Sequence, residues 1–388
     1  MPKTELPEPP RAVREPWRVQ FVSKAIAPPF RDGSKCLVRD LCLHLKDVEP
    51  HVLGTETALA ELGNAAKVHA VYGGASRYAP TLLSNARAFA WLLASEAPDL
   101  FHFVFAPNPR TSGALRLLRQ WTGVPCVQTI ASAPRAFTHP DRLLCGDVVV
   151  AQSEHTAARA KAAFAERGLP APPLEVIPPP APDLGGGPKQ RSLAARAELG
   201  LGPDAPLFVY PGDLEVSGGA RFTLELARRA EGALASATFL IAYRRKTAEA
   251  ERHRAELEAS AAPGRVLFRA ELDDLHAVLS AATAVLLPVD DLYGKVDLPI
   301  VLLEALSLGV PVVVLDWGPL SELEGASHLP PEPRDWLELL AALAQNPSLR
   351  AELGSRGPIA VQQNYAAPRI AARYGQVYRR LLLPAARC

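Results

Sequence analysis

One carboxylate stands in a helix that is otherwise apolar. Glu304 follows Ile300 and Leu303, which recur at helical spacing. Asp297 is predicted to cap this helix, and Pro299 to lie in its first turn, where a missing N–H costs nothing. Such a helix start leaves backbone N–H groups free to bind an anion. An anion-binding helix start followed by a buried acid indicates a ligand with phosphate and hydroxyl groups.

A plainer alternative stays open for the same residues. In a simple βα unit, Glu304 would meet an arginine from elsewhere in the chain, because buried acids are uncommon without a partner. Gly309 is expected to end the helix, and the apolar run 310–315 predicts a strand buried on both faces. Residues 295–322 are therefore expected to form loop, helix, turn, strand and a second polar loop.

Three polar loops follow predicted strands in the second half. Residues 211–220 are rich in glycine, which permits close approach of the backbone to a ligand, and residues 243–246 hold three cations that can clamp a diphosphate. The third loop, 290–299, leads into the helix of Glu304. An ordinary βα turn and a solvated helix start are the alternatives for the first two. The candidate donor-binding residues are Gly212, Asp213, Gly218, Gly219, Arg244, Arg245, Lys246, Lys295, Pro299, Ile300, Val301 and Glu304.

Several familiar site types find no support in the sequence. No P-loop, dinucleotide fingerprint or G-x-S-x-G elbow lies at a predicted strand–helix junction. The five cysteines are scattered and form no C-x-x-C pair, so we predict no metal site and no disulfide framework. This cysteine usage favours a reducing compartment, and we expect a cytoplasmic protein.

Strands alternate with helices along both halves, which predicts parallel, doubly wound sheets. We therefore expect an α/β protein with two Rossmann-like domains that face each other across a cleft. In the first half, strands are expected at 18–23, 50–53, 68–72, 101–106, 126–130 and 147–152, with helices at 34–45, 81–96, 111–122 and 155–166. In the second half, strands are expected at 207–210, 237–243, 265–268, 284–288 and 310–315, with helices at 222–233, 247–260, 272–281, 336–345, 347–363 and 368–383.

The predicted boundaries follow from composition. A chain of 388 residues is too long for one ordinary core, so two domains are expected. The polar, proline-rich residues 1–17 predict a disordered leader, and the Pro- and Gly-rich stretch around 177–188 predicts a linker. The expected order is leader 1–17, first domain 18–180, linker 181–203, second domain 204–367 and a C-terminal helix 368–388.

The first domain is expected to supply the acceptor side of the cleft. Ligands of doubly wound sheets bind at the carboxyl ends of the strands, where the polar loops 27–35, 107–112, 131–137 and 153–156 lie. The candidate acceptor-side residues in these loops are Gly33, Ser34, Asn108, Arg110, Ser132, Arg135 and Glu154.

Composition excludes some partners. The net charge is +1, so bulk charge gives no support for nucleic-acid binding. No apolar run approaches 18 residues, so no transmembrane helix is predicted. The final helix, ending at 378–383, has two readings. It can touch a membrane that carries a lipid acceptor, which would make the protein membrane-peripheral, or it can cross back onto the first domain, which we favour.

The C-terminal half resembles family-4 glycosyltransferases of the GT-B fold. The match is strongest from Leu298 through Glu304 and Gly309 to Glu322, which resembles the family's LEA helix, G-x-P-V-V strand and G-x-x-E ending. Residues 211–219 are similar to the family's G-R-L…K-G loop. Residues 266–288 and 346–378 resemble later family segments, whereas 148–153 and 176–178 of the first half match only loosely.

This resemblance implies a retaining transfer of a sugar from a nucleotide-diphosphate-sugar donor, usually without a bound metal or other cofactor. It implies that Glu304 contacts the nucleotide ribose and that the amides of Ile300 and Val301 receive donor phosphate. Asp297 and Glu304 are the candidate catalytic residues. The expected acceptor is a glycan, a lipid-linked molecule or a small molecule.

The sequence departs from the family at four positions. The first acid of the family's pair falls on Val296, one residue before Asp297. The family's Arg and Lys, which offset diphosphate charge, fall on Asp213 and Gly218, and an aspartate there would repel the diphosphate. The usual histidine of the first domain falls near Ala131. The missing positive charge would have to come from Arg221, Arg244, Arg245 or Lys295.

These departures favour a rival hypothesis from another class. A GT-B protein without catalytic activity would act as a nucleotide-binding or scaffolding partner. Donor hydrolysis distinguishes the two, because active transferases slowly cleave donor without acceptor. A GT-B epimerase or phosphorylase is the third interpretation, and a phosphorylase would carry a pyridoxal lysine in a much longer chain.

Overall fold

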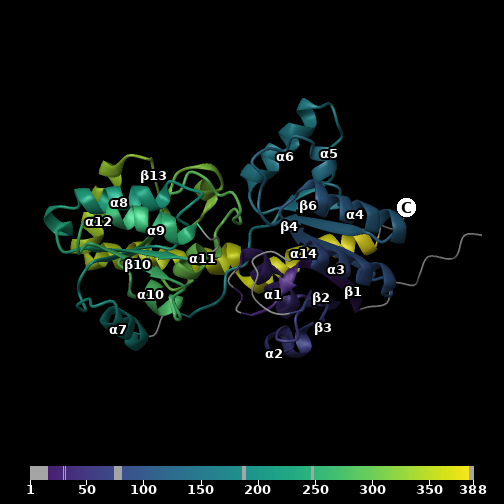
Figure 1. Cartoon of the computed structure of the whole chain (residues 1–388), viewed down its shortest axis with the longest axis horizontal. Coiled ribbons are helices and arrows are strands. Elements are labelled where there is room, and N and C mark those ends of the chain that lie inside the picture. Colours follow the sequence, from purple (N-terminus) through teal and green to yellow (C-terminus); the bar gives the residue numbers. More distant parts are fainter. Residues whose placement is uncertain are drawn as a thin grey trace, which may run out of the picture.

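The computed structural model describes residues 16–28, 30, 32–73, 81–185, 189–245 and 249–383. These residues form two parallel sheets, one in each half of the chain, which lie side by side along the long axis of the molecule (Figure 1). The first sheet has the order β3-β2-β1-β4-β5-β6-β7 and the second has the order β10-β9-β8-β11-β12-β13. Both orders reverse beside the first strand of the sheet, as in doubly wound folds. The prediction of two Rossmann-like domains is confirmed.

The strands are short and mostly buried. The first sheet contains β1 (Trp17–Ile26), β2 (Val48–Gly54), β3 (Lys67–His69), β4 (Leu100–Phe105), β5 (Cys126–Ile130), β6 (Val148–Ala151) and β7 (Leu174–Val176). The second contains β8 (Leu207–Tyr210), β9 (Thr238–Tyr243), β10 (Val266–Ala270), β11 (Ala284–Leu287), β12 (Val312–Leu315) and β13 (Ser327–Leu329).

Helices connect the strands and cover the sheets. The first domain has α1 (Gly33–His44), α2 (Ala58–Leu62), α3 (Leu82–Ala94), α4 (Pro109–Thr122), α5 (Pro140–Leu143) and α6 (Glu154–Glu166). The remaining helices are α7 (Lys189–Glu198), α8 (Gly219–Arg229), α9 (Ala250–Ala259), α10 (Leu275–Ala281), α11 (Ile300–Ser307), α12 (Pro333–Gln345), α13 (Pro347–Ala360) and α14 (Ala367–Leu382). Short 3-10 turns are η1 (Gly63–Ala65), η2 (Gly232–Leu234) and η3 (Gly318–Glu322), and η4 (Val361–Tyr365) is a π turn. None of the described helices is long and apolar enough to cross a membrane.

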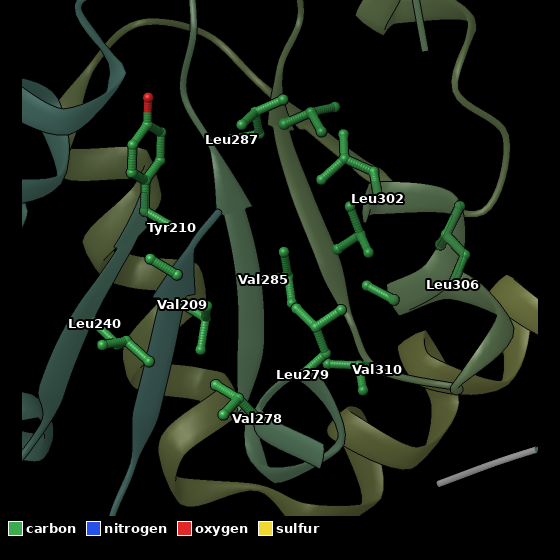
Figure 2. Close-up of a cluster of buried hydrophobic side chains, with 14 of the residues drawn as sticks. Val209, Tyr210, Leu240, Val278, Leu279, Val285, Leu287, Leu302, Leu306 and Val310 are labelled. Carbon is green, nitrogen blue, oxygen red and sulfur yellow. The ribbon is translucent and has the colours of Figure 1, made fainter. Parts of the chain in front are cut away.

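The second core is built around the helix of Glu304. Leu302 and Leu306 of α11 point into one cluster with Val285 and Leu287 of β11 (Figure 2). Gly309 ends the helix with a φ of 72°, a conformation that glycine adopts without strain. The predicted helix, turn and buried strand are therefore all present, and this packing fixes where the start of α11 lies.

Helix α14 belongs to the first domain by its contacts. It lies beside α1 (yellow and purple in Figure 1), and its Tyr374 and Tyr378 are fully buried in the first core. The Tyr378 hydroxyl lies 2.7 Å from Nδ1 of His102 on β4, and the Tyr374 hydroxyl lies 3.2 Å from the hydroxyl of Thr129. Burial lowers the pKa of His102 to about 3, so this histidine is a neutral hydrogen-bonding group. The chain end thus joins the two domains.

Several details differ from the sequence expectations. The edge strands β7 and β13 are not among the predicted strands. Each has three residues, which are too few to show a pattern. The expected linker 181–203 contains α7, whose Ala195 packs in the second core. Residues 1–15 of the expected leader lie outside the described residues, while Trp17 begins β1 and is 1% exposed.

Candidate functional site

The start of α11 has the geometry of an anion site. Pro299 precedes the first helical residue, and its carbonyl accepts from the amides of Leu302 and Leu303 at 2.9 and 3.4 Å. No acceptor is recorded within the described residues for the amides of Ile300 and Val301, as expected for the first turn of a helix. Two adjacent N–H groups are therefore free to bind a phosphate.

The predicted cap of this helix is wrong. No side chain caps α11, and Asp297 instead bonds to the first domain. The hydroxyl of Ser153 donates to Oδ2 of Asp297 at 2.6 Å, and Asp297 is 3% exposed. Burial raises the pKa of Asp297, although the hydrogen bond from Ser153 opposes the rise. In this conformation Asp297 is a contact between the domains.

Asp213 organises the glycine-rich loop. Its Oδ1 accepts from the amides of Glu215, Val216 and Ser217 at 3.2, 2.6 and 3.3 Å, and its other oxygen forms an ion pair with Lys295. Burial would raise the pKa of Asp213, but Lys295 and the loop amides together bring the pKa below its usual value. Lys295 therefore offsets the charge that we expected to repel a diphosphate.

The glycines of this loop pack against protein. The ring of Tyr210 leaves no room for a Cβ at Gly212, and a Cβ on Gly219 would lie 2.7 Å from Cγ1 of Val289. The amide of Gly218 donates to Oδ1 of Asp290 at 3.1 Å. Close backbone approach is thus required here, as predicted for the loop, but in this structure it serves Tyr210 and Val289.

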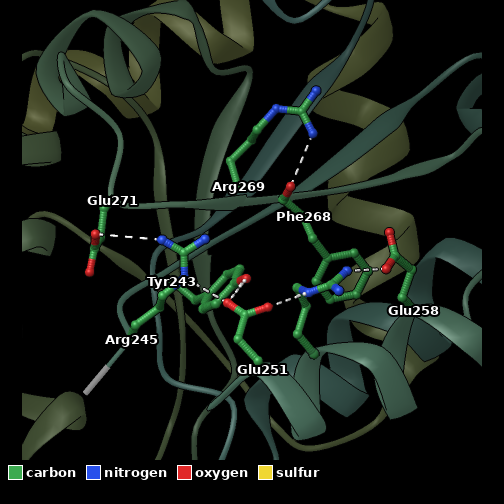
Figure 3. A network of polar contacts seen from close by, with 8 residues as sticks. Tyr243, Arg245, Glu251, Glu258, Phe268, Arg269 and Glu271 are labelled. Carbon is green, nitrogen blue, oxygen red and sulfur yellow. Dashed lines mark hydrogen bonds and ion pairs between the residues drawn. The ribbon is translucent and has the colours of Figure 1, made fainter. Parts of the chain in front are cut away.

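Arg245, one of the cations after β9, already has acidic neighbours. Arg245 bonds to Glu251 at 2.7 Å and lies 3.7 Å from Glu271 (Figure 3). The side-chain bond from Arg245 is the first of several that lower the pKa of Glu251 to about 2. Arg244 is half-buried, and Lys246 lies outside the described residues. The diphosphate clamp at 244–246 stays a prediction, and Arg245 would have to leave this network to join it.

Glu304 is half-buried, and its partner is a histidine. Nε2 of His276, on α10, lies 3.3 Å from Oε1 of Glu304, and the Glu304 side chain is 19% exposed. The bond to Glu304 raises the pKa of His276, against the effect of burial. The plainer alternative gave Glu304 an arginine partner. In the structure its partner is a histidine.

Some predicted acceptor-side residues meet the second domain. A Cβ on Gly33 would lie 2.6 Å from Cγ1 of Val296, so α1 begins directly against the loop before α11. Arg135 lies 3.0 Å from Asp291 and stacks on Tyr293 at 4.6 Å from the ring centre. The amide of Glu154 donates to Glu322 at 2.7 Å.

The other predicted acceptor-side residues have contacts within the first domain. Ser34 is buried and donates to Asp32, and Asn108 caps α4 by accepting from the amides of Arg110 and Thr111, both at 3.1 Å. Arg110 is exposed and Ser132 is buried. Gly33, Arg135 and Glu154 are therefore the predicted residues that the fold brings to the donor side.

The loop 290–297 joins the separate parts of the site. Asp290 and Lys295 contact the glycine-rich loop, while Asp291, Val296 and Asp297 contact three separate segments of the first domain. One loop therefore bridges the predicted donor and acceptor sides. Among the described residues, no group of three or more His, Cys, Asp or Glu is placed to hold a metal ion.

Sequence reasoning missed residues whose partners are distant in the chain. Glu322 accepts from the amides of Glu154 and His155, at 2.7 and 2.6 Å, and so caps the start of α6 across the domain boundary. Ser153 and His276 were also missed. Ser153 has a local signal, because serine directly before a helix is a typical N-cap, and its Oγ accepts from Thr156 at 3.0 Å. Its bond to the second domain has no such signal.

Known proteins share this architecture. Residues 205–346 match the family model of glycosyl transferases group 1. Anabaena Alr3699/HepE in complex with UDP superposes with a TM-score of 0.70 at 14% identity, over 93% of this chain and 99% of that chain. Its complex with UDP-glucose gives 0.69 at the same identity and coverage. The chain has the GT-B fold.

Two further GT-B structures support this assignment. A glycosyltransferase from Rickettsia africae gives a TM-score of 0.68 at 13% identity, over 95% of this chain and 99% of that chain. The lipopolysaccharide outer core galactosyltransferase WaaB gives 0.60 at 14% identity, over 93% and 99%. A search of curated protein sequences found no match. The start of α11 and Glu304 both lie within the part of the chain that matches the family model.

Proposed function

We propose that this protein is a glycosyltransferase that moves a sugar from a nucleotide-diphosphate sugar to an acceptor, with retention of configuration. The match of residues 205–346 to glycosyl transferases group 1 supports the reaction class. The observation that carries the proposal is the start of α11, where two free amides precede a half-buried carboxylate on the same helix. Free amides suit phosphate oxygens, and Glu304 suits the hydroxyls of a ribose.

The donor is proposed to be a uridine-diphosphate sugar. HepE, with the same fold, has been crystallised with UDP and with UDP-glucose. The diphosphate would lie on the amides of Ile300 and Val301, with Glu304 one turn further along the helix. These amides are fixed by the core under α11, so they need no reorganisation as charge develops on the leaving nucleotide.

The acceptor is proposed to enter along the first-domain loops that meet the loop 290–297. Gly33, Arg135 and Glu154 border this contact. Closure of the two domains would exclude water from the donor sugar and so favour transfer over hydrolysis. The resemblance to family-4 enzymes supports retention and a reaction without a bound metal.

One observation favours the inactive alternative. Lys295 is paired with Asp213, Arg245 is paired with Glu251, and Asp290 accepts from the amide of Gly218. Two of the candidate cations are thus held by carboxylates. The carboxylate of Asp290 also takes up an amide of the glycine-rich loop. A nucleotide-binding protein without transferase activity would keep the amides of α11 and need no further positive charge.

Slow cleavage of UDP-glucose without acceptor tests the proposal. We expect release of UDP and glucose above the rate of the buffer alone. We also expect α-glucose as the first-formed anomer in proton NMR, because the donor is an α-glycoside and a retaining reaction keeps this configuration. The Glu304→Ala variant is the matched control and should release less. Binding of UDP-glucose with no release from any sugar nucleotide in a panel would establish the inactive alternative instead.

A further inference from the structure

The pair of His276 and Glu304 links two helices at the proposed donor site. His276 is the second residue of α10, and Glu304 lies in the middle of α11. The distance from Nε2 to Oε1 is 3.3 Å, and the two side chains are 39% and 19% exposed. The histidine therefore contacts one carboxylate oxygen and remains accessible to solvent.

Charged groups from three helices surround this pair. On its own helix, His276 faces Asp274, which also pairs with Arg191 of α7 at 3.0 Å from its Nε. The charge of Glu304 also reaches α1 of the first domain, where it helps to raise the pKa of Cys36, Arg39 and Asp40. Arg39 itself donates to Asp40 at 2.6 Å. Among the described residues, His276 is the side chain that forms an ion pair with Glu304.

We propose that His276 is a positioning residue for the nucleotide. It holds Oε1 of Glu304 and thereby presents Oε2 to the ribose hydroxyls of the donor. A carboxylate fixed in this way binds a diol more tightly than a mobile one, because less side-chain freedom is lost on binding. This inference rests on the proposed function, since it assigns Glu304 to the ribose.

If His276 positions Glu304 in this way, the affinity of the protein for the donor depends on pH. The hydrogen bond to Glu304 raises the pKa of His276, burial opposes the rise, and the charges of Glu304 and Asp274 add to it, while Arg191 opposes it. Below that pKa the imidazolium forms a charge-assisted bond to Glu304 and adds one positive charge near the diphosphate. Above it, both contributions weaken. Donor affinity is therefore highest at low pH and falls as His276 loses its proton.

The test is calorimetric titration of UDP-glucose, whose diphosphate has no titrating proton in the range used. Wild-type protein should lose affinity several-fold between about pH 6 and about pH 8.5, where a histidine titrates. His276→Gln keeps a hydrogen-bond donor but not the charge, so its Kd should change little with pH. His276→Ala should bind about tenfold more weakly than wild type at about pH 6, a loss typical of one charged hydrogen bond.

A matched control lies on another helix of the same domain. His253 of α9 forms a similar pair with Glu256 at 3.7 Å, far along the chain from α11. His253→Gln should keep the wild-type dependence of Kd on pH. A second readout needs no donor. The NMR signal of the His276 ring is assigned by its loss in His276→Gln. This signal should titrate at lower pH in Glu304→Gln than in wild type.

Different results separate this inference from the proposed function. If Glu304→Ala weakens UDP-glucose binding but the His276 variants bind like wild type at every pH, the positioning role is overturned and the donor site stands. If Glu304→Gln leaves the His276 titration unchanged, the pair itself is overturned. If wild-type protein does not bind UDP-glucose, the uridine donor and the positioning role are both rejected.

Discussion

Asp213 and Lys295 form an ion pair that ties the glycine-rich loop to the loop before α11. Their side chains are only 3% and 12% exposed. The pair brings together two loops that are separated by more than seventy residues in sequence. It also explains how a buried aspartate is tolerated in this loop, because the lysine neutralises it.

Loss of Lys295 should destabilise the protein. Lys295→Met leaves a buried, unpaired carboxylate, and removing one partner of a buried pair costs about 3–5 kcal/mol. Urea unfolding measures the difference. Adding Asp213→Asn should recover much of the loss, because no unpaired charge remains. A single variant as stable as wild type would show that the pair does not hold the two loops.

The same pair predicts sensitivity to acid. The pKa of Asp213 is lowered in the folded state, so its contribution to stability is present above the unfolded pKa of about 3.9 and is lost as pH falls through the folded value. The wild-type free energy of unfolding should therefore fall more steeply below about pH 4 than that of the double variant Asp213→Asn, Lys295→Met. Parallel pH profiles would contradict this assignment.

Asp297 should show the opposite dependence. Burial raises its pKa in the folded state, so the folded protein holds the proton more firmly and ionisation above the unfolded pKa reduces stability. Asp297→Asn should be more stable than wild type at neutral pH, with a gain that disappears below about pH 4. The midpoint of urea unfolding at several pH values gives the comparison. A variant that is less stable at neutral pH would instead show that the charged form is favoured in the folded state.

Glu322 should hold the two domains together through the start of α6. In Glu322→Ala the amides of Glu154 and His155 lose their acceptors, and loss of a helix cap costs about 0.5–2 kcal/mol. These amides should exchange with deuterium faster than in wild type. Glu324 is the control, because it is two residues away and pairs with Asn364 at 2.6 Å. Equal exchange in Glu322→Ala and Glu324→Ala would argue against the contact in solution.

Gly33 should be required for the domains to meet. In Gly33→Ala the new methyl group would lie 2.6 Å from Cγ1 of Val296, so the Val296 side chain or the two loops have to shift, and we expect the loops to separate. X-ray scattering should show a larger radius of gyration for Gly33→Ala than for wild type. Adding Val296→Ala to this variant should restore the wild-type radius. Gly113→Ala is the control, because a Cβ there meets nothing within 4 Å. An unchanged radius for Gly33→Ala would show that the contact between Gly33 and Val296 does not control how the domains meet.

The sequence predicted what local patterns determine. Gly309 and the apolar run after it gave the end of α11 and strand β12, because both depend on neighbouring residues alone. Asp297 misled for the same reason. Its type and position suit a helix cap, but Ser153 of the other domain is its partner. The partners of Glu322 and Glu304 likewise come from elsewhere in the chain, and no single sequence reveals such pairings.

The proposed donor site is tested most directly by calorimetric titration of UDP-glucose and of uridine into wild-type protein and Glu304→Ala. We expect wild type to bind UDP-glucose more tightly than uridine, because the amides of Ile300 and Val301 receive the diphosphate. Glu304→Ala should weaken both ligands by a similar factor, about tenfold, since the ribose is common to them. Equal affinity of wild type and Glu304→Ala for UDP-glucose would contradict the site.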